Sequence, residues 1–211
     1  MRRLPGRPAR SVRRAPWREA GFVALDFETT GLDPVHDDVI SFGAVPVADG
    51  RIDLSGSLYR EVAPRVEPRH SSIRVHHLRT QDLASAPAMS EVVDGFREVL
   101  AGRVILAWAA GVEIAFLRRI FGGWNRTWRS RTIDVRTLIM ALERGGSPDT
   151  ANDPGRYALG SAAERFGVPV EETHHALDDA FMTAELFLIA AARISAGGRG
   201  SVGHLMRIRA R

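Results

Sequence analysis

The sequence predicts a single α/β domain with a mixed five-stranded sheet covered by helices. Three strand-like segments follow one another with short connections, which is typical of an antiparallel meander. The segments after the meander alternate between helix and strand, as expected for parallel strands joined through helices. The chain has 211 residues, 45% of them hydrophobic, which is enough for one sizeable core, and we expect no second domain.

The first half of the chain supplies the meander. Apolar runs and alternating patterns predict its three strands at residues 21–27, 39–48 and 51–61. Asp49-Gly50 is a tight-turn signal that joins the second strand to the third. A proline-containing loop and then a short helix are expected next, at residues 62–75 and 80–84.

The second half alternates helix with strand. Apolar residues recur at helical spacing in five segments, at residues 90–100, 114–120, 134–144, 159–166 and 175–194. The continuous apolar run at residues 104–108 is typical of a strand that is buried on both faces. A fifth strand is expected just before Ile133 and Asp134. Residues 145–155 are rich in Gly, Pro, Asp and Asn, and are expected to form a mobile loop.

Charge is distributed unevenly along the chain, whose cations other than histidine are all arginine. Residues 1–20 carry a net charge of +6 and residues 197–211 one of +4, so the body between them carries −6. We therefore expect a disordered arm over residues 1–20, a folded domain over 21–195 and a flexible basic tail over 196–211. Either tail can dock on a partner or on a phosphate backbone, or stay solvated, and the sequence leaves these alternatives open.

Composition restricts the kinds of site that the chain can form. The absence of cysteine excludes disulfides and thiolate metal sites, so a metal would be held by carboxylate oxygen or histidine nitrogen. Such ligands favour Mg²⁺ or Mn²⁺. No apolar stretch resembles a secretory signal or a membrane span, so we expect a cytoplasmic protein with no membrane contact.

Two carboxylates, Asp26 and Glu28, end the first strand and precede a Thr-Thr-Gly turn. Because side chains alternate along a strand, these two lie on one face, about 7 Å apart along the chain. Ligand sites in such sheets usually lie at the carboxyl ends of the strands. The pair therefore predicts a site for divalent cations. A solvated strand end is the alternative, but it is rarely combined with Phe27 between the acids and this turn behind them.

A site with two metal ions needs further carboxylates from distant parts of the sequence. The chain offers Glu113, Asp134, Asp153, Asp178 and Asp179. The last two lie in the segment His-His-Ala-Leu-Asp-Asp-Ala at residues 174–180, at the start of the final predicted helix.

These two acidic segments resemble motifs of the DEDDh 3′→5′ exonucleases, the family of the bacterial polymerase III proofreading subunit, ribonuclease T and oligoribonuclease. The first family motif, Asp-x-Glu-Thr-Thr-Gly, matches residues 26–31, and the third, His-x-Ala-x-x-Asp-Ala, matches residues 174–180. The segment from Tyr157 to Pro169 also resembles the approach to the third motif. The resemblance extends from residue 21 to about 193 and implies a ribonuclease H-like fold.

The second motif departs from the family pattern. Alignment on Phe116-Leu117 places Trp108-Ala109 where the family has His-Asn, and Glu113 where it has Asp. Glutamate keeps the charge but is one methylene longer, which matters for a rigid Mg²⁺ site if it ligates directly. In the family this acid often acts through metal-bound water, which would tolerate the longer side chain. Loss of the Asn should weaken contact with the terminal nucleotide.

The resemblance implies roles for the matching residues. Asp26 would bridge two Mg²⁺ or Mn²⁺ ions, Glu28 and Asp179 would complete the site of one of them, and Glu113 would be the fourth metal-linked acid. His174 would be the general base, a role that suits histidine near neutral pH. His175 is the alternative base, because it lies four residues before Asp179, as the tyrosine of a related subfamily does.

Residues around the first motif are expected to hold the terminal nucleotide. The expected substrate contacts are Phe27, Thr29, Thr30, Leu32 and Trp108. Leu32 can wedge between the last two bases, whereas Trp108 either stacks on a base or closes the core. His76 and His77 match no motif and are expected at the surface or at a helix entry, with a substrate contact as the less favoured alternative. A site of this kind binds single strands through stacking and phosphate contacts.

The sequence therefore predicts a metal-dependent 3′→5′ exonuclease that releases nucleoside monophosphates from single-stranded 3′ ends, with DNA favoured over RNA. A DNA polymerase or another replication or repair subunit is a candidate partner. Two alternatives stay open. One is a module that binds 3′ ends with weakened catalysis, as the altered second motif suggests, and the other is an RNA-directed exoribonuclease.

Overall fold

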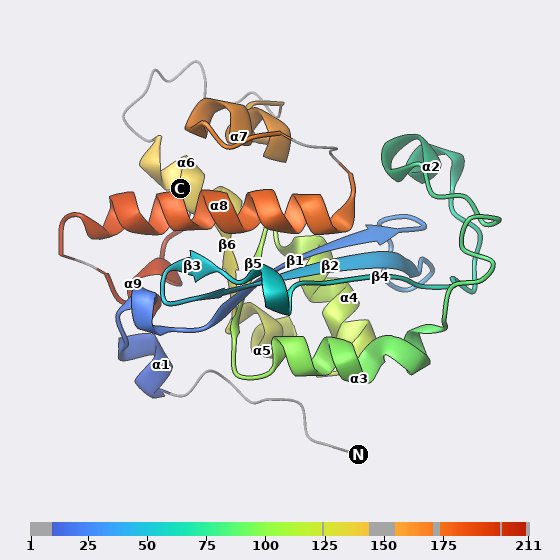
Figure 1. Ribbon diagram of the computed structural model, residues 1–211, viewed down its shortest axis with the longest axis horizontal. Helices are drawn as coiled ribbons and strands as arrows, with labels where there is room; N and C mark the ends of the chain where they lie inside the picture. The colour runs from blue at the N-terminus through green and yellow to red at the C-terminus, as the bar shows by residue number, and fades with distance from the viewer. Residues whose placement is uncertain (1–9, 124, 144–154, 171–173, 199, 210–211) are drawn as a thin grey trace.

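The computed structural model describes residues 10–123, 125–143, 155–170, 174–198 and 200–209 (Figure 1). The loop expected at residues 145–155 therefore lies, apart from Gly155, outside the described residues, and so does Asp153. Among the described helices, none is both long enough and apolar enough to cross a membrane.

One mixed sheet forms the centre of the domain. Its strands are β1 (Phe22–Thr29), β2 (Val39–Ala48), β3 (Arg51–Ile52), β4 (Leu58–Glu61), β5 (Val104–Ala107) and β6 (Thr132–Asp134). The order is β3-β2-β1-β5-β6, and β4 also pairs with β2. β1 is antiparallel to β2 and parallel to β5, which is parallel to β6. The predicted mixed α/β sheet with a central first strand is confirmed.

The third predicted strand, at residues 51–61, is divided into β3 and β4. Both pieces pair with β2 in the antiparallel sense. Between them the carboxylate of Asp53 accepts hydrogen bonds from the backbone N–H groups of Ser55 and Gly56, which turns the chain into a short 3-10 helix, Leu54–Gly56. The described sheet consequently has six strands rather than five.

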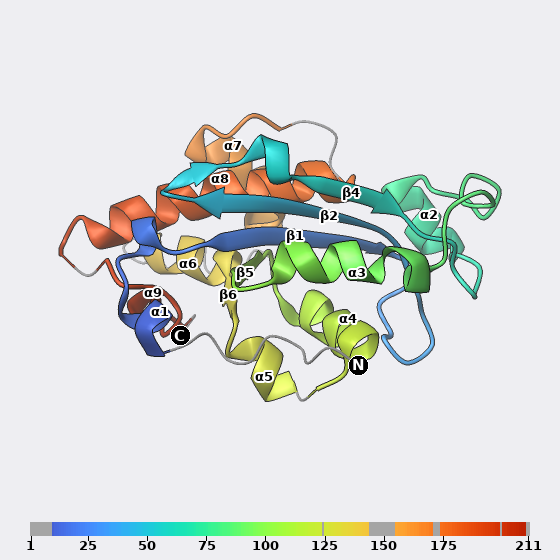
Figure 2. The ribbon, with the colours of Figure 1, turned by 60° about the horizontal axis from the view of Figure 1, so that its bottom comes forward.

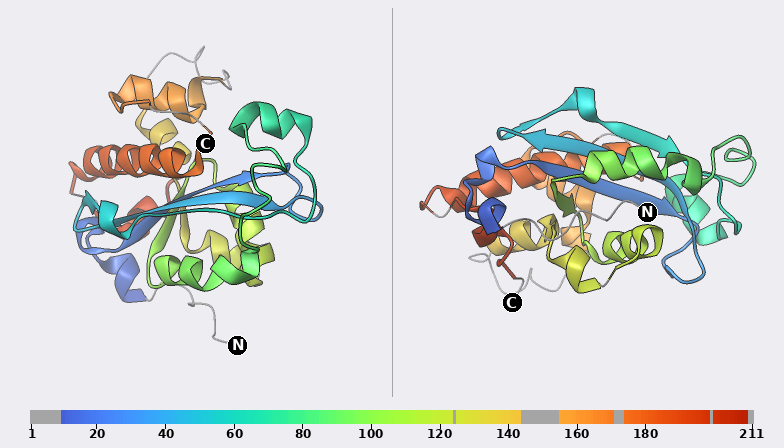
Figure 3. Two further views of the ribbon diagram at one scale, coloured as in Figure 1. Left: turned by 45° about the vertical axis from the view of Figure 1, so that its right-hand side comes forward. Right: turned by 90° about the horizontal axis from the view of Figure 1, so that it is seen from below.

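Helices cover both faces of the sheet (Figures 1, 2 and 3). One face packs against α6 (Val135–Leu142), α7 (Leu159–Phe166) and α8 (Ala176–Ser195), and the other against α3 (Met89–Leu100), α4 (Gly111–Phe121) and α5 (Asn125–Arg129). Each face has its own buried core, because the residues of β1 alternate between the two. Phe22 and Ala24 face α8, whereas Val23 and Leu25 face α3 and α4.

The short helix after the meander lies earlier than predicted. Residues 80–84 form turns around Asp82, whose carboxylate accepts a hydrogen bond from the Arg79 N–H. The helix is instead α2 (His70–His76), inside the predicted loop and beyond the end of β1 in Figure 1. Its N-terminal end is held to the first motif, because the Arg69 N–H and the Ser72 hydroxyl both donate to the carbonyl of Thr30.

Both terminal segments pack against the domain where the structure describes them. They contain α1 (Arg10–Arg14) and α9 (Val202–Leu205). The Trp17 side chain is only 3% exposed and meets the ring of Phe187 edge-on, at 6.0 Å between centroids. The Trp17 N–H donates to the carbonyl of Gly200, and the Val202 N–H to that of Ala15. Residues 1–20 were expected to be disordered and residues 196–211 to be flexible. This expectation is corrected for the parts of both segments that the structure describes, because the apolar side chain of Trp17 anchors them to the core.

We expect Trp17→Ala to lower the free energy of unfolding by about 3–5 kcal/mol, the usual cost of removing a large buried aromatic side chain. Urea denaturation of the full chain measures it. Glu19→Ala, a change at an exposed position in the same turn, is the control and should cost less than about 0.5 kcal/mol. Equal stability of the two variants would show that the terminal segments do not anchor to the core through Trp17.

Candidate active site

A groove of about 510 Å³ opens at the carboxyl end of β1. Its walls come from β1, the loop after β1, α2, the first turn of α4 and the start of α8. The sequence predicts a site at the carboxyl end of a central strand, and the groove brings this end together with segments as far away along the chain as Asp179.

Three predicted side chains meet in this groove. One ligand atom each of Glu28, His174 and Asp179 lies within 4.8 Å of the other two. Glu28 comes from β1 and Asp179 from the first turn of α8, and His174 lies just before that helix with a φ of 66°. The His174 N–H donates to Asp179 Oδ2 at 3.2 Å, which ties the approach to α8 to its first turn. Such a cluster of two carboxylates and an imidazole can bind a divalent cation.

Close packing of α8 on the sheet places this cluster. Gly43 on β2 pairs with Asp26 on β1. A Cβ atom on Gly43 would lie 2.2 Å from the main-chain oxygen of Ala176, which is far inside van der Waals contact. The start of α8 can approach Asp26 and Glu28 only because residue 43 has no side chain.

Asp26 and Glu113 add two more carboxylates to the site. Burial and the negative charges of Glu113, Asp179 and Glu28 raise the pKa of Asp26 well above its usual value. Glu113 lies in the first turn of α4 and is 5% exposed, and burial raises its pKa as well. Within the described structure, Glu113 Oε2 and Asp179 Oδ1 have no hydrogen-bond partner. Buried carboxylate oxygens without partners are costly unless a cation binds them, so this donor set fits hard divalent ions.

These raised pKa values predict how metal ions change stability. Burial and the charge of Asp179 raise the pKa of Glu28 from 4.5 to about 8, and burial raises that of Asp179 from 3.8 to about 6. Because the folded state favours the protonated forms, the metal-free protein should lose stability as pH rises from about 4 to about 8. Added Mg²⁺ or Mn²⁺ should therefore raise the melting temperature more at about pH 8 than at about pH 5.

Differential scanning fluorimetry at the two pH values, with and without metal, measures this difference. Glu28→Gln is the control, because it removes one titrating carboxylate and should reduce both the pH dependence and the gain from metal. A melting-temperature gain that is equal at the two pH values would contradict this account of the site.

The two adjacent histidines have different environments. His174 belongs to the cluster with Glu28 and Asp179, whereas the ring of His175 stacks on Tyr59 at 4.6 Å between centroids. His175 Nδ1 lies 3.0 Å from Asp178 Oδ2. The geometry therefore favours His174 over His175 as the histidine that acts at the cluster.

Only some of the predicted substrate contacts face the groove. Phe27, Thr29 and Leu32 line it, and Leu32 is 75% exposed. Thr30 is fully buried, because its hydroxyl accepts a hydrogen bond from the Asp38 N–H, and it stabilises the turn instead. The indole N–H of Trp108 donates to the carbonyl of Tyr157, and its ring packs against the core under α8. Trp108 is not among the residues that line the groove, which favours the core alternative over a base contact.

His76 lies in the groove, which favours the substrate-contact alternative for this residue over a position at the surface. It ends α2, is 7% exposed, and also lines an adjoining cavity of about 400 Å³. Its Nδ1 accepts a hydrogen bond from the Leu78 N–H, and burial lowers its pKa, so the ring is neutral at pH 7. Its Nε2 has no hydrogen-bond partner within the described residues. No motif indicates His76, and only the true position of α2 reveals it.

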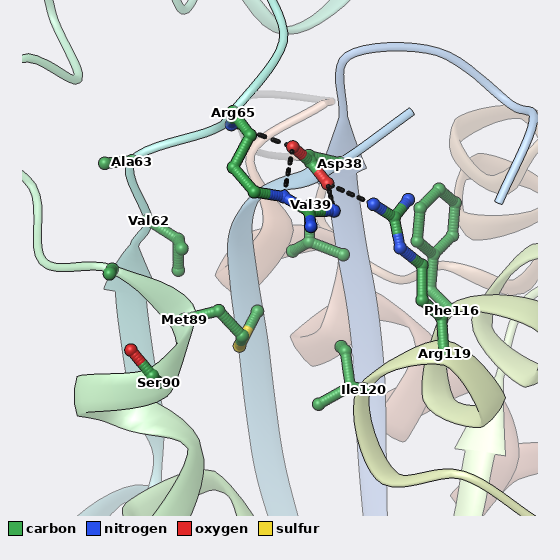
Figure 4. Close-up of a pocket in the computed structure, with 11 residues that line it drawn as sticks. Asp38, Val39, Val62, Ala63, Arg65, Met89, Ser90, Phe116, Arg119 and Ile120 are labelled. Atoms are coloured by element: carbon green, nitrogen blue, oxygen red, sulfur yellow. Dashed lines mark hydrogen bonds and ion pairs between the residues drawn. The ribbon is translucent and has the colours of Figure 1, made fainter. Parts of the chain in front are cut away.

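Ion pairs between arginines and two buried carboxylates, Asp37 and Asp38, hold the loop that carries Leu32, residues 30–38. Asp38 Oδ1 lies 2.7 Å from Arg65 Nη2 and 2.6 Å from Arg119 Nη2, so two guanidinium groups hold one carboxylate (Figure 4). Asp37 lies 3.1 Å from Arg69 Nη2, and Arg69 also lines the groove. These contacts hold the C-terminal end of the loop, and Asp37 also accepts a hydrogen bond from the Asp33 backbone N–H next to the exposed leucine.

Comparison with known proteins agrees with this site. A family model described as exonuclease matches residues 23–187, from β1 into α8. The chain belongs to this exonuclease family. The predicted family, and with it the class of enzyme, is thereby confirmed, and the matched range contains both acidic motifs of the exonuclease domain.

Relatives and solved structures agree with the family. The exonuclease domain is 33% identical over 177 residues to a DNA polymerase III PolC-type protein of Thermotoga petrophila, covering 82% of this chain and 12% of that protein. It is 29% identical over 193 residues to a DNA polymerase III subunit epsilon-like protein of Rhodobacter capsulatus, covering 90% of this chain and 26% of that protein. The chain thus spans a small part of the length of these relatives. Exonuclease I of E. coli, in complex with a dT13 oligonucleotide, shares the fold with a TM-score of 0.71 and 14% identity, over 85% of this chain and 43% of that one.

Proposed function

We propose that this chain is a 3′→5′ exonuclease that releases nucleoside monophosphates from single-stranded 3′ ends, with DNA preferred over RNA. The observation that carries the proposal is the convergence of Asp26, Glu28, Asp179 and His174 in one groove at the end of β1, with the buried Glu113 close enough to raise the pKa of Asp26. The acids come from three distant segments, β1, α4 and α8, which is the arrangement that two-metal phosphodiester hydrolysis requires.

Asp26, Glu28, Glu113 and Asp179 would hold two Mg²⁺ or Mn²⁺ ions. When bound, the cations supply a lowered pKa for the attacking water and neutralise negative charge that develops on the phosphate. His174 would accept a proton from this water at a ring nitrogen, since histidine is the side chain best suited to that task near neutral pH. The hydrogen bond from the backbone N–H of His174 to the Asp179 carboxylate keeps this histidine next to the acids.

The groove would hold the terminal nucleotide through its other walls. Thr29 and Phe27 lie beside the acids, and His76 offers a neutral ring whose Nε2 has no partner in the described structure. Leu32 is exposed on a loop that is held in place by ion pairs of two buried aspartates, and would insert beside the last base. Stacking and phosphate contacts of this kind discriminate little between bases.

We expect Leu32→Ala to weaken binding of a single-stranded 3′ end by about 1–3 kcal/mol, roughly 5- to 150-fold, because it removes the stacking surface for a base. Equilibrium binding of a fluorescent strand measures it. Val35→Ala is a matched control, as Val35 is 71% exposed in the same loop but does not line the groove. If both variants bind like the parent, Leu32 does not contact the strand.

The preference for DNA and the partner are supported by the names of the relatives, which are DNA polymerase III proteins. We propose that the chain acts with a DNA polymerase or with another replication or repair subunit. A cytoplasmic location stays a prediction.

Initial rates on matched 3′-labelled DNA and RNA strands, with Mg²⁺ and with Mn²⁺, test the substrate assignment. Release of mononucleotides is expected from both, faster from DNA. A strong preference for RNA of a few nucleotides would replace the DNA assignment with oligoribonucleotide turnover.

A second candidate function is a module that binds 3′ ends with weakened catalysis. Its support is Glu113, which stands where the family has aspartate and is buried with an unpaired carboxylate oxygen. This candidate predicts tight binding of 3′ ends with turnover no faster than that of Asp26→Ala at any concentration of either metal. Glu113→Asp distinguishes the two candidate functions. If Glu113 is what weakens catalysis, restoring the aspartate of the family should raise turnover sharply.

A further inference from the structure

A second cavity, of about 460 Å³, adjoins the groove across the first turn of α4. Val112 lines the groove, and its neighbour Gly111 lines this cavity. The other walls come from β6, the start of α6 and residues 205–209 after the start of α9, and Figure 2 shows these elements grouped at one end of the molecule. We call this space the C-terminal cavity.

Positive charge is concentrated in the C-terminal cavity. Three arginines from three separate segments line it, Arg129, Arg136 and Arg209. Across the described residues, neither Arg129 nor Arg136 has a carboxylate within ion-pair distance, whereas the arginines beside the groove loop, Arg65, Arg69 and Arg119, are all paired. The acid in the lining is Asp134, which accepts a hydrogen bond from the Thr137 N–H as the cap of α6. The lining thus carries a net charge of +2, of which Arg129, Arg136 and Asp134 supply +1 from a body of net charge −6, and Arg209 supplies +1 from the basic tail.

The uncharged part of the lining combines apolar side chains with two hydroxyl groups. The apolar side chains include those of Ile114, Leu138, Leu205, Met206 and Ile208, and the hydroxyl groups belong to Thr132 and Thr137. At Gly111 a Cβ atom would meet nothing within 4 Å, so the main chain between the groove and the cavity faces open space. An apolar floor with guanidinium groups around it suits a nucleotide, whose base packs on the floor while its phosphate pairs with arginine.

We propose that the C-terminal cavity binds the phosphates of nucleotides that lie upstream of the scissile bond, so that the strand leaves the groove over the first turn of α4. The inference rests on the proposed function of the groove and extends it to the path of the strand. A single strand held at its 3′ end is a polyanion that must continue in the 5′ direction, and this cationic cavity is separated from the groove by one helical turn. Residues 205–209 of the basic tail would then form part of the strand-binding surface.

Strand length is the variable that tests this path. The variants are Arg129→Gln and Arg136→Gln, singly and together, in the full chain, and the control is Arg51→Gln, an exposed arginine on β3 at the opposite edge of the sheet. We measure kcat/KM on 5′-labelled DNA strands of two to ten nucleotides. The ratio of parent to double variant is expected to grow with length, to about tenfold on the longest strand, because only longer strands reach the arginines. Arg51→Gln should show no such growth.

Binding without turnover provides an independent measurement. Affinity for a ten-nucleotide strand is measured by anisotropy against salt concentration, without divalent metal. The slope of log K against log salt should be shallower by about 1.4 in the double variant, since each lost single-strand phosphate contact removes about 0.7. Melting temperatures check that the variants fold, and the single variants serve if the double variant does not.

Several outcomes would overturn the inference. One is a ratio of rates that is the same at every length, and another is a salt slope equal to that of the parent. A third concerns free dAMP. If the parent binds free dAMP and the double variant does not, while the rates of both proteins depend on strand length in the same way, the cavity is a site for free nucleotide. If the parent shortens no strand, the proposed function fails, and the salt slope alone decides the inference.

Discussion

Asp26→Asn is expected to lower kcat by about 10³-fold or more and, at the same time, to raise the melting temperature of the metal-free protein. Burial raises the pKa of Asp26, and so do the three neighbouring carboxylates of Glu113, Asp179 and Glu28. Asparagine is neutral at every pH, so the folded state no longer has to keep a buried carboxyl group protonated at this position, and the metal-free protein gains stability. Metal ions supply several kcal/mol of transition-state stabilisation, and each 1.36 kcal/mol is tenfold in rate, so loss of the proposed metal ligand Asp26 should nearly abolish turnover.

The opposite signs of these two effects separate a functional site from a structural one. Asp178→Asn is the matched control, because Asp178 neighbours Asp179 in α8 but lies beside His175 rather than in the cluster. It should change kcat less than about tenfold. If Asp26→Asn instead lowers the melting temperature of the metal-free protein, Asp26 is held by structural contacts, and the electrostatic account of the groove is wrong.

Gly43→Ala is expected to have the second largest effect, although residue 43 contacts no substrate. Its new Cβ would lie 2.2 Å from the Ala176 oxygen and 2.4 Å from the Leu177 nitrogen, and main-chain atoms cannot rotate away as a side chain can. Either the start of α8 moves or β2 does. We expect a loss of about 1–3 kcal/mol in the free energy of unfolding, as for other overpacked sites. Displacement of Asp179 and His174 by about 1 Å should lower kcat about 100-fold.

Gly95→Ala provides the control for this change. Gly95 lies within α3, and a Cβ there meets nothing within 4 Å, so the same substitution should be neutral or stabilising by up to about 1 kcal/mol. Full activity and parent-like stability of Gly43→Ala would show that α8 does not need its close contact with β2.

Much of the fold follows from local patterns in the sequence. β1, β2 and β5 are long or continuous apolar runs, and the helices with a clear apolar face, such as α3 and α8, lie where their spacing predicts them. The departures have local causes that such patterns do not record. Asp53 breaks the third strand through hydrogen bonds to the two residues that follow it. α2 begins where Thr30, some 40 residues earlier in the chain, accepts hydrogen bonds from it.

The candidate site was predictable where it depends on motifs and unpredictable where it depends on packing. Glu28, His174 and Asp179 stand in matched motifs, and the structure brings them together. His76 stands in no motif, and it reaches the groove only because α2 folds over the end of β1. Thr30 belongs to a motif but faces inward, where its hydroxyl accepts a hydrogen bond from the Asp38 backbone N–H. Trp17 has its partner, Phe187, 170 residues away, so a basic terminal segment could not be recognised as packed.

The product pattern of a 5′-labelled single DNA strand tests the central claim most directly. With Mg²⁺ or Mn²⁺ the parent protein should shorten the strand one nucleotide at a time from its 3′ end, and both a chelator and Asp26→Asn should stop the reaction. Internal cleavage products, or an unchanged ladder from Asp26→Asn at the parent's rate, would contradict the claim that the groove at the end of β1 is the active site of a metal-dependent 3′→5′ exonuclease.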